Sequence, residues 1–373
     1  MSKDSHGGQG SILFFSGGSA LKEVSRKLAG ITPNTVHIIS TFDSGGSTAE
    51  LRRAFNMPAP GDLRLRLSTL ATLASSSGCE FFERRLGGNG RRELLEIIDG
   101  ESGVVAGFRS LLEFFIQIMP ADFDLRGAAL GNLILAADYL KNGRSLYEST
   151  RRVASALGVC GTVLPVSEDP VHLAVRLENG ALLVGQHNFT GKNGLEPSAP
   201  IRNMFFCREL DDPSPAQVRP GRGVLESIAA SSLICYPVGS FYSSVLANLR
   251  VEGVGEALRK SPAKKVYMPN PGRDPESLAL SLEEHLELIC RAVRGESLAA
   301  KSLVDASGII DFLLVDSQNA AYAGGIPTGW CSRHGVKIMD CAYVEPDAQG
   351  RALISSGKCA ALLPRLASIC NLA

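Results

Sequence analysis

"SILFFSGGSALKEVSRKLAG" (residues 11–30), followed by "TVHIIST" (35–41), decides the fold. An apolar run, a Gly-Gly turn and an amphipathic segment ending at Gly30 predict a buried strand, a tight turn and a helix. The second run is short and rich in β-branched residues, which favours another strand. Two strands about 20 residues apart, with a helix between them, make the first half of a parallel βαβ unit. The sequence therefore predicts an α/β fold built on a parallel sheet.

Four later segments repeat the pattern of an apolar run that ends in a turn or a polar residue. They are "SSLICYPVGS" (231–240), "AKKVYMPN" (263–270), "DFLLVDS" (311–317) and "VKIMDC" (336–341). Such runs are typical of parallel strands covered by helices on both faces. Asn179-Gly180, inside "HLAVRLENGALLVGQ" (172–186), is in addition a strong signal for a two-residue hairpin turn. We predict a three-layer, Rossmann-like α/β fold.

We expect one α/β domain over residues 11–373. Residues 1–10 are polar and glycine-rich, which predicts a disordered terminus and argues against a signal peptide. Helical patterns predict a helical insertion in the first half, at about 75–130. The stretch 188–222 is rich in Pro, Asn, Gly and charged residues, so we expect a loop or small insertion there.

The overall composition excludes several classes of partner. The 373 residues include 38 basic and 38 acidic side chains, and the formal net charge is zero. This balance gives no reason to expect nucleic acid or an anionic membrane surface as a partner. No apolar run approaches the ~18 residues of a membrane span. Nine cysteines are scattered without a CxxC pair, which is typical of reduced thiols, so we expect a cytoplasmic protein.

Polar residues follow the first two predicted strands at the edge where ligands bind in parallel sheets. Gly17, Gly18 and Ser19 come after the first strand, and free N–H groups at the following helix start favour a phosphate. A plain strand–helix turn is the alternative. After the second strand, Asp43 precedes Ser44 and a polar nest that contains Gly45, Gly46 and Ser47. Asp43 could bind a cation or act as a base, or Asp43 and Ser44 could cap a helix that begins near Ala49.

Two further segments add candidate ligand-binding groups. Asp62 and Arg64 follow Pro60-Gly61, and Arg64 together with Arg52 would supply fork-shaped donors for a phosphate or carboxylate. Asp62 could instead be an N-cap. The segment "YPVGSFYSS" (236–244) offers N–H groups and hydroxyls at Gly239, Ser240 and Ser243. Its Tyr242 could stack on a base, although a tyrosine in the core is the commoner outcome.

Two histidines suit structural roles better than catalytic ones. His37 lies inside an apolar strand, so we expect a hydrogen-bonded core residue. His285 lies in a glutamate-rich helix, so we expect it at the surface or behind a site. No His, Cys and Asp cluster has zinc spacing.

In this order, these motifs resemble the CofD-like superfamily, which includes 2-phospho-L-lactate transferase and the YvcK-type gluconeogenesis factors. Further matches follow in "LGNLILAA" (130–137), "GTVLPVSED" (161–169), "PVGSFYSSVLANL" (237–249) and "VYMPNPGRDPESLALSLEEHLELI" (266–289). The resemblance covers most of residues 11–295 and is greater to the gluconeogenesis-factor branch. It implies that the single domain is CofD-like.

The resemblance implies a nucleotide or nucleotide-sugar bound at the strand ends. In the transferase branch a phospholactyl group moves from a guanosine-linked donor to a deazaflavin, with magnesium and release of GMP. The other branch is similar to a UDP-sugar-binding regulator of carbon and cell-wall metabolism. Carried over to this chain, the resemblance implies Asp43 and Asp62 as catalytic carboxylates, Asp43 as a magnesium ligand, Asn132 as a ligand-binding residue and a homodimer as the assembly.

Two of the departures of this chain from the family pattern concern the residues that follow the first two strands. The family's Gly-Gly-Thr-Gly is Gly17-Gly18-Ser19-Ala20 here, and the family's paired Asp-Asp is Asp43-Ser44. One glycine and one carboxylate are therefore missing, which indicates a divergent sub-branch. Two functions fit: a transferase of a phosphorylated group that uses a nucleotide-diphosphate donor, or a non-catalytic regulator that binds a nucleotide-sugar.

Overall fold

The computed structural model describes residues 10–71, 76–100, 106–191, 196–277 and 280–371. The disordered terminus expected at 1–10 lies outside these ranges except for Gly10. Within them, no helix is long and apolar enough to cross a membrane.

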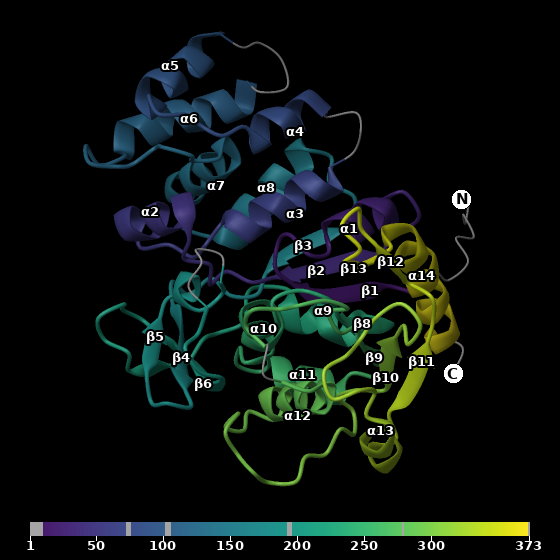
Figure 1. Ribbon diagram of the computed structural model, residues 1–373. Helices are drawn as coiled ribbons and strands as arrows, with labels where there is room; N and C mark the ends of the chain where they lie inside the picture. The colour runs from purple at the N-terminus through teal and green to yellow at the C-terminus, as the bar shows by residue number, and fades with distance from the viewer. Residues whose placement is uncertain (1–9, 72–75, 101–105, 192–195, 278–279, 372–373) are drawn as a thin grey trace.

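The centre of the fold is a seven-stranded parallel sheet with the order β11-β10-β9-β8-β1-β2-β3 (Figure 1). The strands are β1 Ile12–Ser16, β2 Thr35–Ile39, β3 Thr162–Pro165, β8 Leu233–Tyr236, β9 Lys264–Tyr267, β10 Phe312–Val315 and β11 Lys337–Asp340. Ile12 pairs with both Thr35 of β2 and Leu233 of β8, so the strand order reverses direction at β1. Such a switch point leaves a crevice beyond the carboxyl ends of the strands, where α/β proteins bind ligands. The α/β prediction is confirmed.

Helices cover both faces of this sheet, and β1 shows why. Its residues are all buried and alternate between two cores. Ile12 and Phe14 pack towards α1 and α14, whereas Leu13 and Phe15 pack towards the helices of the opposite face. The bounds of these helices are α1 Lys22–Ala29, α9 Val224–Ala230, the π-helix η3 Phe241–Leu246, α10 Ala247–Leu249, α11 Val254–Lys260, α12 Leu282–Val293, α13 Thr328–His334 and α14 Ser356–Asn371. A small antiparallel pair, β12 Val344–Pro346 and β13 Ala352–Ile354, precedes α14.

A layer of helices occupies the chain between β2 and β3. Its members are α2 Gly46–Phe55, α3 Gly61–Leu70, α4 Ser76–Glu83, α5 Gly90–Gly100, α6 Ala106–Ile118, α7 Leu130–Lys141 and α8 Leu146–Ala156. They share a hydrophobic core of their own, which meets the sheet at Ile39 and Val163. The insertion expected at about 75–130 contains α4, α5 and α6, and helices precede and follow it; residue 75 and residues 101–105 lie outside the described ranges.

The stretch 188–222, where we expected a loop or small insertion, belongs in part to a second, antiparallel sheet. It contains β6 (Ile201–Cys207) and β7 (Pro215–Ala216), which join β4 (His172–Leu177) and β5 (Leu182–Val184) in an antiparallel sheet of order β5-β4-β6-β7. The strand was hidden because its apolar run "MFFC" lies between polar and charged residues. The hairpin predicted at Asn179-Gly180 is confirmed, since β4 and β5 pair antiparallel across it.

Candidate functional site

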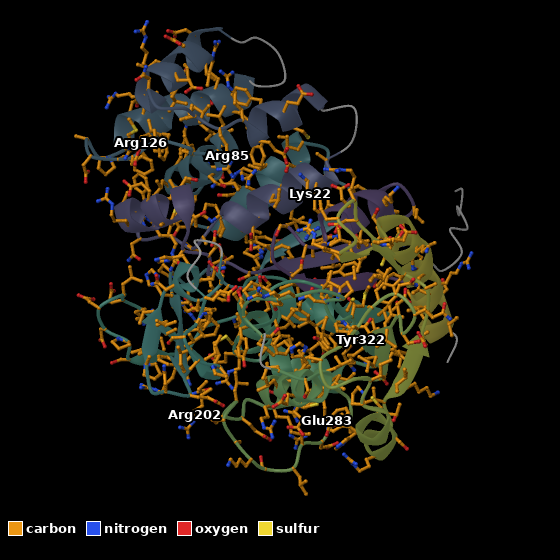
Figure 2. The ribbon with its side chains drawn as sticks, in the orientation of Figure 1. Lys22, Arg85, Arg126, Arg202, Glu283 and Tyr322 are labelled. Atoms are coloured by element: carbon orange, nitrogen blue, oxygen red, sulfur yellow. The ribbon has the colours of Figure 1, made fainter. Side chains whose placement is uncertain are left out.

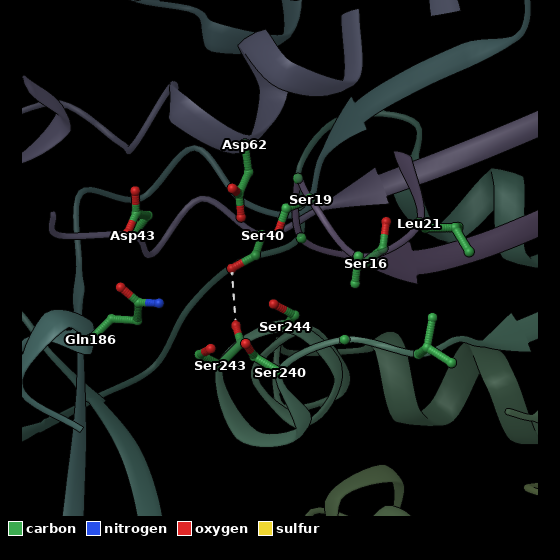
Figure 3. Close-up of a pocket in the computed structure, with 15 residues that line it drawn as sticks. Ser16, Ser19, Leu21, Ser40, Asp43, Asp62, Gln186, Ser240, Ser243 and Ser244 are labelled. Carbon is green, nitrogen blue, oxygen red and sulfur yellow. Dashed lines mark hydrogen bonds between the residues drawn. The ribbon is translucent and has the colours of Figure 1, made fainter. Parts of the chain in front are cut away.

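A pocket, called here the inner pocket, opens beyond the carboxyl ends of β1, β2 and β8 (Figure 3). It is lined by residues 16–21, Ser40, Asp43, Asp62, Gln186, residues 238–240, Ser243 and Ser244. An adjoining outer pocket is lined by Ser19, Asp43, residues 45–48, Gly61, Asp62, Arg64, Leu65, Arg85, Asn132, Gln186, His187 and Thr190. The two pockets share Ser19, Asp43, Asp62 and Gln186. All the site residues expected from the sequence line one pocket or the other, except Arg52 and Tyr242.

The turn after β1 is fixed from behind by Arg66, which is fully buried. Its guanidinium donates to the carbonyl oxygens of Gly17 (3.1 Å) and Gly18 (3.4 Å) and to the hydroxyl of Ser25. Because the C=O and N–H of a trans peptide point in opposite directions, the N–H groups of Gly18 and Ser19 point away from Arg66. In the described part of the chain, neither N–H donates a hydrogen bond. The turn therefore presents free donors just before α1.

Gly17 and Gly18 are required at this turn by close packing. A Cβ on Gly17 would lie 2.6 Å from Ser244 Oγ, and one on Gly18 would lie 2.7 Å from a carboxylate oxygen of Asp62 and 3.0 Å from Leu65 Cδ2. The two glycines thus bring α3, with Asp62 in its first turn, against the strand end. Figure 3 shows the Asp62 carboxylate directed towards the space between Ser19 and Ser40.

Arg52 is not a ligand-binding arginine in this structure. It is buried and donates to the carbonyl oxygens of Phe42, Asp43 and Val171. Burial lowers the pKa of Arg52 to about 10, and the nearby Asp43 opposes this shift. Arg52 therefore holds the loop that carries Asp43, and its donors are not available to a phosphate. The sequence could not show this, because a buried and an exposed arginine on an amphipathic helix look alike.

Neither Asp43 nor Ser44 caps α2, which begins at Gly46 after Gly45 and has no side-chain cap. Among the described residues, no hydrogen bond or ion pair satisfies the Asp43 carboxylate, which faces both pockets. Ser44 is buried, and its hydroxyl lies 2.8 Å from Nδ1 of His187 and accepts from the backbone N–H of the same histidine. Ser44, where the resemblance implies a second carboxylate, thus positions a histidine at the rim of the outer pocket.

The first N–H groups of η3, which follows β8, are already occupied. Phe241 N–H donates to Asp274, and the N–H groups of Tyr242 and Ser243 both donate to Glu276, which also accepts from the Ser243 hydroxyl at 2.6 Å. Two buried carboxylates therefore take the first three N–H groups of η3, and these donors are not free for a phosphate. Gly239 N–H likewise donates to Asn270.

Tyr242 belongs to the core. Its hydroxyl donates to the carbonyl of Ile201, and its pKa is raised by burial. It lines neither the inner nor the outer pocket, so its ring is not placed to stack on a base bound in either of them. Of this segment, Gly239, Ser240 and Ser243 do line the inner pocket.

The two histidines singled out from the sequence also have structural surroundings. His37 is fully buried and stacks on Phe14, as expected of a core residue. Contrary to the prediction, neither of its ring nitrogens has a hydrogen-bond partner among the described residues. Burial lowers its pKa well below the usual value. His285 is half-buried, stacks on Phe241 and bonds to the Tyr267 hydroxyl at 3.0 Å.

Sequence reasoning missed Arg66, Arg85, Gln186 and His187. Arg66 and Arg64 stand two residues apart in α3, and only packing shows that one faces the β1 turn and the other the outer pocket. Gln186 and His187 come from η2 (Gln186–Asn188), a single turn after the hairpin. Gly185, which precedes η2, has φ of 90° and packs against the His187 ring. The only signal in the sequence was therefore a glycine directly before a polar pair.

Together the fold and the pockets define a three-layer α/β protein with a candidate ligand site at the switch point of its parallel sheet. The family model for 2-phospho-L-lactate transferase CofD matches residues 12–325, and the chain belongs to this CofD family. It is 28% identical to the gluconeogenesis factor of Bacillus subtilis over 309 residues, 83% of this chain and 79% of the relative. It is also 28% identical to that of Halalkalibacterium halodurans over 279 residues, 74% of this chain and 72% of the relative.

A solved structure from Bacillus halodurans, described as a member of the UPF0052 family, has the same fold. The TM-score is 0.70 at 24% identity, and the match covers 95% of this chain and 99% of that one. The relatives therefore agree with the CofD-like and gluconeogenesis-factor resemblance.

Proposed function

We propose that the protein binds a nucleotide or nucleotide-sugar with its diphosphate in the inner pocket, and that it transfers a phosphorylated group from a nucleotide-diphosphate donor. The observation that carries the proposal is the turn at Gly18 and Ser19, whose N–H groups are free among the described residues while Arg66 holds the opposite carbonyls. Successive free N–H groups at a helix start are a preferred phosphate site. A diphosphate on this turn would lie beside Asp43 and Asp62.

Asp43 and Asp62 would then orient the acceptor group, and Arg64 would offset phosphate charge from the outer pocket. Magnesium fits these residues as a shared cation. The described residues contain no group of three His, Cys, Asp or Glu side chains able to hold a metal, yet Mg²⁺ is commonly held by one or two carboxylates together with substrate phosphates. Asp43, with its unpaired carboxylate, would be the ligand. A bound Mg²⁺ would neutralise charge on the diphosphate.

A second candidate function is a regulator that binds a nucleotide-sugar without turnover. The observation that favours it is Ser44, whose hydroxyl is committed to His187, so the site holds one carboxylate fewer than the family pattern. The names of the relatives also describe gluconeogenesis factors.

A nucleotide panel with and without magnesium tests both functions in one experiment. A ligand at 100 times its Kd should add about 2.7 kcal/mol to the free energy of unfolding, which a thermal melt detects. Product release measured on the stabilising ligands then separates transferase from regulator. Asp43→Asn should abolish turnover while leaving the melt of the free protein intact, and Asp122→Asn, an exposed carboxylate outside both pockets, is the control. If no nucleotide or nucleotide-sugar raises the melting temperature, the proposal is wrong.

A further inference from the structure

Arg64 is a buried cation without a partner. Its side chain is 8% exposed, it lines the outer pocket, and within the described ranges its guanidinium makes no hydrogen bond or salt bridge. Burying an unpaired charge is costly, so proteins rarely keep one unless a ligand completes it. Burial lowers the pKa of Arg64, and the nearby Arg85 lowers it further, while Glu83 and Asp62 oppose the shift.

Arg85 brings a second cation to the same pocket from the helical layer. The backbone of Arg85 bridges to Ala129, just before α7, and its Nη1 donates to the carbonyl of Gly127 at 2.8 Å. Nothing acidic forms a salt bridge with Arg85 among the residues described. Figure 2 shows Arg85 near α7, with Arg126 farther out on the same layer. Two arginines that face one pocket repel each other, and an anion bound between them would offset this repulsion beyond what the Asp43 and Asp62 carboxylates of the same pocket do.

The opposite wall of the outer pocket is the start of α2. Gly46, Ser47 and Thr48 line it, and α2 has no side-chain cap for its first N–H groups. Asn132 is buried beside them. Its amide donates to the Ser47 hydroxyl at 3.1 Å, and no described residue donates to its carbonyl oxygen. A ten-residue helix end and two guanidinium groups thus converge on one space from three elements.

We propose that the outer pocket is a second anion subsite, which takes the phosphoryl group of a separate phosphorylated small molecule through Arg64, Arg85 and the N-terminus of α2. The inference rests on the proposed function only in placing the nucleotide diphosphate at the inner turn. A phosphate dianion matches two guanidinium groups and a helix end better than a singly charged carboxylate does. Arg64 is the fixed charge, and the more exposed Arg85 closes over the ligand. The second substrate or effector is therefore itself a phosphate ester.

The test is calorimetric binding of inorganic phosphate at low salt to the wild type, Arg85→Gln, Arg85→Lys and Arg126→Gln. Loss of one charge-assisted hydrogen bond should weaken phosphate binding about tenfold in Arg85→Gln, and Arg85→Lys should recover part of the affinity. Arg126→Gln removes the same charge from an exposed arginine outside the pocket and should bind like the wild type. Acetate is titrated in parallel.

Unchanged phosphate affinity in Arg85→Gln overturns the subsite, as does acetate binding as tightly as phosphate. Nucleotide binding, measured on the same four proteins, separates this inference from the proposed function. If nucleotides bind but the affinity for phosphate does not depend on Arg85, only the proposed function is supported. If phosphate binding depends on Arg85 but no nucleotide binds, only the anion subsite is supported.

Discussion

Arg66→Met is expected to destabilise the protein and to disorder the candidate phosphate turn at the same time. Methionine fills much of the space of the aliphatic stem but donates no hydrogen bond. The carbonyls of Gly17 and Gly18 then lose the donor that orients their peptides. The N–H groups on the other side of those peptides would no longer be held towards the inner pocket.

The magnitude follows from the contacts of Arg66. Two bonds are short, to Ser25 and Gly17, and three are long at 3.4–3.5 Å, to Ser16, Gly18 and Leu21. Counting the long ones together as one bond, and each charge-assisted bond at about 1.5–3 kcal/mol, the loss is roughly 4.5–9 kcal/mol. Burial lowers the pKa of Arg66 from 12.5 to about 10, although Asp62 opposes this shift. The buried charge therefore costs about 3 kcal/mol of folding free energy, and its removal in Arg66→Met restores that amount. The expected net loss is about 1–6 kcal/mol.

Urea unfolding measures this loss directly, and the melting shift produced by the best nucleotide measures the function of the turn. Arg92→Met is the control, because the Arg92 side chain is 82% exposed and pairs only at the surface with Glu96, so its effect should stay within about 0.5 kcal/mol. An Arg66→Met protein with wild-type stability and an unchanged nucleotide shift would refute the reasoning about the turn.

Two further predictions concern stability. Burial lowers the pKa of His285 to about 4 from 6.5, so below pH 6.5 the unfolded chain takes up a proton that the folded chain refuses. Through this histidine, the free energy of unfolding should therefore fall by about 3 kcal/mol between pH 6.5 and 4. The fall should be smaller in His285→Phe, which keeps a ring to stack on Phe241. Denaturant titrations at several pH values measure it, and the same dependence on pH in both proteins would contradict the prediction. Glu276→Gln should cost about 1–3 kcal/mol in urea unfolding by weakening the cap of η3 and the bond to the Ser243 hydroxyl, whereas the exposed Glu209→Gln should cost almost nothing; equal stabilities would exclude the capping role.

Short-range pattern was sufficient to predict the parallel sheet. Each of its strands is an apolar run that ends in a turn, and the order of elements along the chain determines the layers. Strand β6 escaped detection because its pairing with β4 depends on a hairpin register set elsewhere in the chain. A single sequence shows composition within a segment but not the partner that makes the segment a strand.

At the site, the sequence predicted which loops meet but not which of their atoms are free. Gly18 and Ser19 keep free N–H groups. The N–H groups of Tyr242 and Ser243, which looked equally promising, donate to Glu276 more than 30 residues away along the chain. Arg52 was expected to donate to a ligand for the same reason, but its guanidinium donates to backbone carbonyls of loops that the sequence did not show to be near it. Donor availability depends on tertiary contacts, which the residue type does not reveal.

Strand β1 has β2, its immediate successor, on one side and β8, from the second half of the chain, on the other (Figure 1). A break in the exposed loop between β6 and β7 would therefore place β1 and β8 on different fragments, so each strand would lose the other as a neighbour. Neither fragment contains a complete binding site, because Gly18 and Asp43 would lie on one fragment and Ser240 on the other. Co-expressed fragments should gain solubility and ligand response only by reassembly, which makes this chain a candidate for split-protein complementation at that loop.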